Sequence, residues 1–190
     1  MTNRVLGLVC SSAGGVEAVR EKLVRPLIDD GWTVAVTATP TAARWLKESG
    51  ELAKLEALTG LPVRHQPRLP AEISPHPTVD CYAVVPATAN TVAKLALGLG
   101  DNQALTQLCE AIGGREIPVV IFPRVNEAHT GQPAWANHLD ALRKAGVHLV
   151  YGEDVWPVHK PRSAPGLPLP WKAIRRAIED AVGEQSPPCG

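Results

Sequence analysis

Short apolar runs alternate with longer segments of helical periodicity along almost the whole chain. The runs with the length and β-branched character of buried parallel strands are Val5–Cys10, Trp32–Thr37, Cys81–Val85, Ile117–Phe122 and Val147–Tyr151. Apolar residues recurring every three or four positions predict helices over residues 16–30, 39–46, 51–60, 91–112, 135–145 and 171–182. Pro86 cannot donate a ladder hydrogen bond, so we expect the third strand to end before it.

This alternation predicts an α/β fold: a Rossmann-like, flavodoxin-like doubly wound parallel sheet between two helical layers. Residues 61–80 and 156–170 are rich in proline and are expected to form long loops. We expect a single domain over residues 1–183 and a disordered tail over residues 184–190.

The composition mainly argues against certain partners and sites. The chain has 190 residues, enough for one domain with a sizeable core, and carries 19 basic and 19 acidic residues. That balance favours neither nucleic acid nor an anionic membrane as a partner, and no apolar run is long enough to span a bilayer. The start of the chain leads directly into a strand without a signal-peptide pattern, and the 4 cysteines are scattered. We therefore expect a reduced, cytoplasmic protein without a metal site.

Small and polar residues follow three of the predicted strands. These turns are residues 11–15, 37–42 and 86–90. Because the carboxyl ends of parallel strands share one sheet edge, the turns predict a single ligand site there. Small residues let a flat ligand approach the backbone, and the free N–H groups at helix starts can hold an anion. The same hydroxyls could instead serve only as helix caps, and the residues alone leave both interpretations open.

Two motifs at this edge carry a family resemblance. Pro86–Thr91, followed by Ala93-Lys94 and by Gly98-x-x-Asp101-Asn102, resembles the signature of the homo-oligomeric flavin-containing cysteine decarboxylases. Phe122–Asn126 resembles that family's Pro-x-Met-Asn loop, and the likeness extends from about residue 4 to about residue 182.

The resemblance implies noncovalent FMN as the cofactor and a homotrimer, or a multiple of trimers, as the assembly. It implies that Thr39 and Thr41 contact the FMN phosphate. The other residues that it places against the cofactor are Ser11, Ser12, Ala87, Thr88 and Asn90. The implied substrate is a small molecule or peptide with a thiol or a carboxylate. In the family, flavin takes a hydride from the carbon that bears sulfur, and the product then loses carbon dioxide.

The resemblance also implies catalytic residues. Asn126 matches the asparagine that holds the substrate carboxylate, and Asn90 would fix flavin and substrate relative to each other. The family's catalytic histidine falls on Glu72, which could move a proton if its pKa is tuned. His65 or His76 could replace it if the alignment contains a gap.

Two further regions differ from the family pattern: residues 129–130 stand where the family has Met-Trp, and the loop over 156–170 lacks the glycines and the catalytic cysteine of the family's substrate flap. His129 stands where the family has methionine, and Arg124 could contact an anion, although a surface arginine is the more frequent case. These departures leave three functions open: an FMN-dependent decarboxylase, an FMN redox enzyme that does not decarboxylate, and a flavin-binding regulatory protein.

Overall fold

Five parallel strands form one sheet, and their order is β2-β1-β3-β4-β5. The strands are β1 (Val5–Cys10), β2 (Thr33–Ala38), β3 (Cys81–Ala87), β4 (Val119–Pro123) and β5 (His148–Leu149). The structure is a computed structural model and describes residues 4–163 and 167–183. The strand order is that of a flavodoxin-like doubly wound sheet, so the predicted fold class is confirmed.

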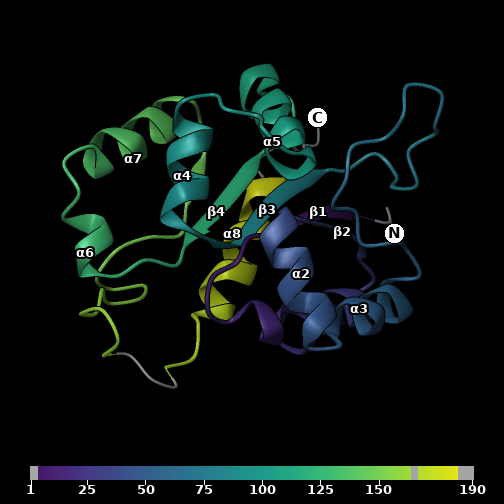
Figure 1. Ribbon diagram of the computed structural model, residues 1–190, viewed down its shortest axis with the longest axis horizontal. Coiled ribbons are helices and arrows are strands. Elements are labelled where there is room, and N and C mark those ends of the chain that lie inside the picture. The colour runs from purple at the N-terminus through teal and green to yellow at the C-terminus, as the bar shows by residue number, and fades with distance from the viewer. Residues whose placement is uncertain (1–3, 164–166, 184–190) are drawn as a thin grey trace, which may run out of the picture.

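Helices cover both faces of the sheet (Figure 1). Those packed in one core cluster with the strands include η1 (Val16–Ala18), η2 (Arg20–Val24), α1 (Arg25–Asp29) and α8 (Trp171–Gly183). Those packed in the other cluster are α4 (Ala89–Ala96), α5 (Gln103–Gly114) and α7 (Trp135–Lys144). Beside β2 lie α2 (Pro40–Glu48) and α3 (Glu51–Thr59), which also contact η1 and η2 respectively.

Pro86 lies inside β3, so the prediction that the strand ends before it is wrong. The Val85–Pro86 peptide bond is cis, and the register against β4 shifts between Val84 and Ala87. A proline costs the ladder one donor, and the irregularity in register accommodates that loss within the strand. The carbonyl of Pro86 still accepts a hydrogen bond, from the backbone of Ser11 at 3.2 Å.

Two predicted helices are less regular than their periodicity suggests. The expected helix over 16–30 is a 3-10 turn, a π-helical stretch and a short α-helix, and Pro26 has no N–H to donate to the Lys22 carbonyl. The expected helix over 91–112 is broken between α4 and α5. Gly98 there has a φ of +70°, and the Asn102 side chain caps α5 by accepting from the Leu105 N–H.

The loop over 61–80 joins α3 to β3 and projects from the body of the molecule (Figure 1). Ile73 and Leu69 on this loop are 92% and 67% exposed. The segment after β5 instead packs down, since Trp156 and Leu169 are buried. At Gly15, where φ is +98°, an added Cβ would lie 2.5 Å from Cδ1 of Leu169. This close approach places the segment after β5 directly against the turn after β1.

Residues 184–190, predicted as a tail, lie outside the described residues. Among the helices of residues 4–163 and 167–183, none combines the length and apolar character needed to cross a membrane.

Candidate functional site

A cavity of about 520 Å³ opens at the carboxyl edge of the sheet. It is lined by the turns after β1, β3 and β4: Ser12, Ala13, Gly14, Thr88, Ala89, Asn90, Arg124, Val125, Asn126 and His129. The chain reverses its order across the sheet between β1 and β3, which is where open α/β sheets bind ligands. The volume lies in the range of small-molecule sites, about 300–1,000 Å³. Among the described residues that line it there is a cation, Arg124, and no acidic side chain, a combination that suits an anionic ligand.

Ser11 joins two walls of this cavity without lining it. Its hydroxyl donates to the carbonyl of Pro86 at 2.8 Å and accepts from the backbone N–H of Thr88, also at 2.8 Å. The side chain is buried, and its single proton is already donated within the protein. Ser11 therefore clips the end of β1 to the start of α4, and its predicted contact with a cofactor stays a prediction.

Two of the three predicted threonines, Thr39 and Thr88, cap helices. The Thr39 hydroxyl accepts from the Ala42 N–H at 3.4 Å at the start of α2, and the Thr88 hydroxyl accepts from the Thr91 N–H at 3.1 Å at the start of α4. Thr39 also donates its backbone N–H to the Cys10 carbonyl at 2.9 Å, which sets the start of α2 beside the turn after β1. Thr41 is exposed in the first turn of α2. The first N–H groups of such helices face outward without an intrahelical partner.

Asn126 and His129 form a reciprocal cap on the short helix α6 (Glu127–Thr130), an element that the sequence did not predict. The side-chain carbonyl of Asn126 accepts from the His129 N–H at 3.2 Å. The His129 Nδ1 accepts from the Asn126 backbone N–H at 3.4 Å. This arrangement leaves the side-chain NH2 of Asn126 and the Nε2 of His129 for a ligand in the cavity.

Arg124 is half-buried at the cavity wall, whereas an exposed surface position was the commoner expectation from sequence. Its backbone N–H donates to the Ala87 carbonyl at 2.8 Å, which fixes the turn between the ends of β3 and β4. Its guanidinium carbon lies 4.2 Å from the ring centre of Trp156, within cation–π range. Burial lowers the pKa of Arg124 from its ordinary value.

The three candidate proton carriers on the loop over 61–80 lie outside the cavity of their own chain. Glu72 is exposed, and its carboxylate accepts from the Leu69 N–H at 2.8 Å. His65 lines a separate hollow of about 540 Å³ beside α2. His76 is half-buried with its Nε2 2.7 Å from the Pro62 carbonyl, and burial lowers its pKa. Of the predicted catalytic residues, the structure brings only Asn90 and Asn126 together in one cavity.

Sequence reasoning missed the support of Arg124 by Trp156. Trp156 is held by a hydrogen bond from its Nε1 to the Pro168 carbonyl at 3.2 Å. Its ring also meets Phe122 edge-on, with ring centres 6.3 Å apart. A tryptophan in a proline-rich loop gives no signal of which arginine it will stack on.

The donor set of the cavity fits a flavin mononucleotide. Small residues of the turn after β1 leave open space, since an added Cβ at Gly14 would meet nothing within 4 Å. The start of α4 lines the cavity among residues that include no carboxylate, which suits an anion such as a phosphate, whereas Thr39 and Thr41 at the start of α2 lie beside the turn after β1 and are not among the lining residues. Among the described residues, no group of three His, Cys, Asp or Glu side chains is placed to hold a metal ion.

Comparison with known proteins decides the family. The family model described as Flavoprotein matches residues 2–180. The chain belongs to the Flavoprotein family. The predicted resemblance to flavin-containing cysteine decarboxylases is confirmed by this match and by the neighbours below.

Three relatives illustrate the likeness. The chain is 37% identical to a cysteine/cysteine sulfinic acid decarboxylase of an unknown prokaryotic organism, over 37% of this chain and 19% of that protein. It is 29% identical to the coenzyme A biosynthesis bifunctional protein CoaBC of Escherichia coli K12, over 77% of this chain and 36% of that protein. The crystal structure of the FMN-dependent cysteine decarboxylase SpaF matches with a TM-score of 0.65 and 26% identity, covering 95% of this chain and 97% of that one. The chain thus spans about a third or less of the two curated relatives.

Proposed function

We propose that this flavoprotein binds FMN noncovalently in the carboxyl-edge cavity and uses it on a substrate with a thiol and a carboxylate, with loss of carbon dioxide. The observation that carries the proposal is the cavity itself: three turns converge on a space whose described lining has no acidic side chain, and the cap on α6 uses the side-chain oxygen of Asn126 and not its NH2. The neighbouring SpaF structure, an FMN-dependent cysteine decarboxylase, supports the choice of cofactor.

Thr39 and Thr41 at the start of α2 would hold the phosphate, together with the N–H groups of that helix start. Ser12, Thr88 and Asn90 would contact the rest of the cofactor from the two turns that line the cavity. Ser11 and Ala87, which are buried, would act by fixing those turns. When bound, flavin supplies a two-electron acceptor, which none of these side chains can provide.

Asn126 would donate its side-chain NH2 to the substrate carboxylate, and Asn90 would orient the substrate. A neutral donor suits this task, because it positions a carboxylate without strongly stabilising the charge that must be lost as carbon dioxide leaves. His129 lies in the same cavity, and because its Nδ1 accepts from the Asn126 N–H, its Nε2 carries the ring proton and would donate a hydrogen bond to an anionic group of the ligand. Glu72 projects away from its own cavity, so its proposed proton role requires the cavity of a neighbouring subunit.

That requirement agrees with a homotrimer, or a multiple of trimers, which we propose as the assembly. The projecting loop over 61–80 exposes Leu69 and Ile73, and the break between α4 and α5 exposes Leu97 and Leu99. Apolar side chains of this size on projecting segments favour burial against another subunit. Light scattering should return at least three times the chain mass of 20.2 kDa, and a monomer that retains flavin would contradict the assembly.

A reduced, cytoplasmic setting is part of the proposal. Within the described residues Cys10, Cys81 and Cys109 are free thiols. Burial raises the pKa of both Cys10 and Cys81 to about 12, so these two are packing residues and not reactive thiols.

The experiment identifies the cofactor first and then assays the reaction. The purified protein should be yellow and should release FMN on denaturation; a colourless protein, or one that releases FAD, would show the cofactor to be wrong. Anaerobic mixing with cysteine, cysteine sulfinate and a peptide ending in cysteine should release carbon dioxide from at least one of them. Bleaching of the flavin without carbon dioxide would identify a redox enzyme that does not decarboxylate.

A second candidate function is a flavin-binding regulatory protein. It is favoured by the placement of Glu72, His65 and His76 outside the cavity, which leaves the family's catalytic histidine without an equivalent in the same chain. Flavin that is bound but bleached by no thiol or acid would support it.

A further inference from the structure

Arg124 presents an unusual combination of burial and missing partners. Its Nε is buried and has no hydrogen-bond partner among the described residues. Other described arginines pair with carboxylates instead: Arg20 forms a salt bridge with Glu51, and Arg175 forms one with Glu179. A buried N–H of a charged group without an acceptor is costly, so a partner is expected from outside the chain.

The guanidinium is also held in place. It lies over the ring of Trp156, and that ring is fixed by the Pro168 carbonyl and by edge-on contacts with Phe122 and His159. Stacking restricts the plane of the guanidinium while leaving its N–H edge for in-plane hydrogen bonds. Arg124 lines the same cavity as Asn126 and His129, so its side chain borders the space that we assign to the substrate.

The chemistry of carbon dioxide loss decides which group Arg124 binds. A carboxylate that leaves as carbon dioxide gives up its charge, and a guanidinium bound to it would stabilise the ground state more than the transition state. Asn126 supplies the neutral donor that this carboxylate needs. Arg124 is better matched to an oxyanion that keeps its charge throughout the reaction.

We propose that Arg124 binds a second, non-reacting oxyanion of the substrate, a carboxylate or a sulfinate, so that the preferred substrates are dianionic acids. The inference rests on the proposed function, because it assigns the substrate class of the same cavity. It makes Arg124 a specificity-determining residue, whose effect belongs to binding and not to the chemical step.

Two probe thiols that differ by one carboxylate test it: 3-mercaptopropionate and mercaptosuccinate, titrated into the flavin-loaded protein by calorimetry. The wild type should bind mercaptosuccinate about ten- to a hundredfold more tightly, the effect expected of one charged hydrogen-bonded contact. Arg124→Met should bind both probes equally, and Arg124→Lys should keep part of the preference. Arg115→Met, which removes an exposed arginine at the opposite sheet edge, is the matched control and should keep all of it.

Failure here is separable from failure of the proposed function. A wild type without preference, or a preference that survives in Arg124→Met, overturns the assignment even if FMN is bound and carbon dioxide is released. Nitrogen NMR gives an independent readout that needs no variant to fold. The Arg124 Nε–H signal should shift saturably with mercaptosuccinate, and an unmoved signal at saturation of the calorimetric site would also overturn the proposal.

Discussion

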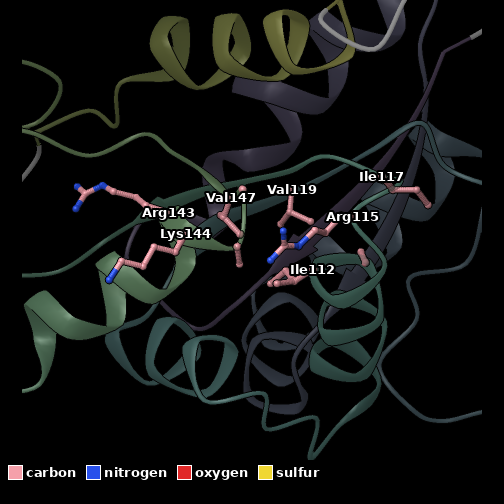
Figure 2. Close-up of a pocket in the computed structure, with 10 residues that line it drawn as sticks. Ile112, Arg115, Ile117, Val119, Arg143, Lys144 and Val147 are labelled. Carbon is pink, nitrogen blue, oxygen red and sulfur yellow. The ribbon is translucent and has the colours of Figure 1, made fainter.

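The two edges of the sheet each carry a cavity with arginine in its wall, and they differ in what surrounds the charge. At the amino edge, a hollow of about 200 Å³ is lined by Arg115, Arg143 and Lys144 together with apolar residues. Figure 2 shows Arg143 and Lys144 extending away from Ile112, Val119 and Val147. Arg143 pairs with Asp140 at 3.5 Å, so its charge already has a partner.

Helix direction explains the difference. Each helix that follows a parallel strand starts at the carboxyl edge and ends at the amino edge, so the two edges meet opposite ends of the helix dipoles. Cations at the ends of α5 and α7 complement the negative partial charge of those helix ends. At the carboxyl edge, Arg124 lies beside helix starts, and no acidic side chain is among the described residues of the cavity wall. A cation therefore indicates a ligand site when it is buried and lacks a carboxylate partner; its presence in a cavity wall alone does not.

The largest effect should come from placing a carboxylate in the carboxyl-edge cavity. Asp keeps the cap on α6, because its side-chain oxygen can accept from the His129 N–H as Asn126 does. Asn126→Asp should therefore fold normally and lose about a hundredfold or more in kcat/KM for carbon dioxide release, since a donor becomes a repelling charge. Asn137→Asp, on the exposed surface of α7, adds the same charge away from the cavity and should leave turnover unchanged. Equal turnover of Asn126→Asp and wild type would show that the site is wrongly placed.

Variants of Ser11 and Ser12 distinguish a residue that supports the cavity from one that contacts its ligand. Ser11→Ala removes the acceptor of the Thr88 N–H and should lower the free energy of unfolding by about 1–3 kcal/mol in the flavin-free protein. Ser12→Ala, in the cavity wall, should leave that free energy nearly unchanged and weaken FMN instead. Urea unfolding and FMN titration of both variants measure the two effects. The reverse pattern would make Ser11 the ligand contact.

The next effect in size is a loss of FMN affinity, expected from changes at the start of α2. Replacing Thr39 and Thr41 together with valine removes two hydroxyls from the proposed phosphate site and should weaken FMN tenfold or more. Thr39→Val also removes a helix cap, at about 1 kcal/mol of stability, so Thr41→Val alone is the cleaner measure of binding. Lys144→Met at the amino edge is the control that should keep full affinity. Full flavin occupancy of the double variant in dilute solution would exclude the phosphate assignment.

The amino acid sequence predicted this sheet edge because its signals are local. Apolar runs located all five strands, although β5 is limited to His148–Leu149. The small-residue turns after β1 and β3 line the cavity as predicted, whereas the turn predicted after β2 is not among the lining residues and the turn after β4 is. The break between α4 and α5 was not predicted, although its local signals, Gly98 and the capping Asn102, stand in the sequence.

The roles of individual side chains were not readable, because a hydroxyl or amide after a strand suits a cap and a ligand equally. The Ser11 hydroxyl is occupied by Pro86 and Thr88, which lie 75 and 77 residues away in the chain. Likewise, no local pattern indicates that Trp156 will stack on Arg124. Contacts between residues so far apart in sequence exist only once the sheet has formed.

The smallest expected effect is a change in stability at the amino edge. Arg115 ends α5 in the left-handed region, with a φ of 59°, and donates its backbone N–H to the Ala111 carbonyl at 3.0 Å. A side chain costs about 1–2 kcal/mol in this conformation, and glycine returns about 0.5–1 kcal/mol of that as lost unfolded-state entropy. Arg115→Gly should therefore stabilise the protein by about 0.5–1 kcal/mol in urea unfolding, with FMN affinity and the mercaptosuccinate preference both unchanged. A loss of either binding property would mean that the amino-edge cavity takes part in ligand binding, and the contrast between the two edges would then fail.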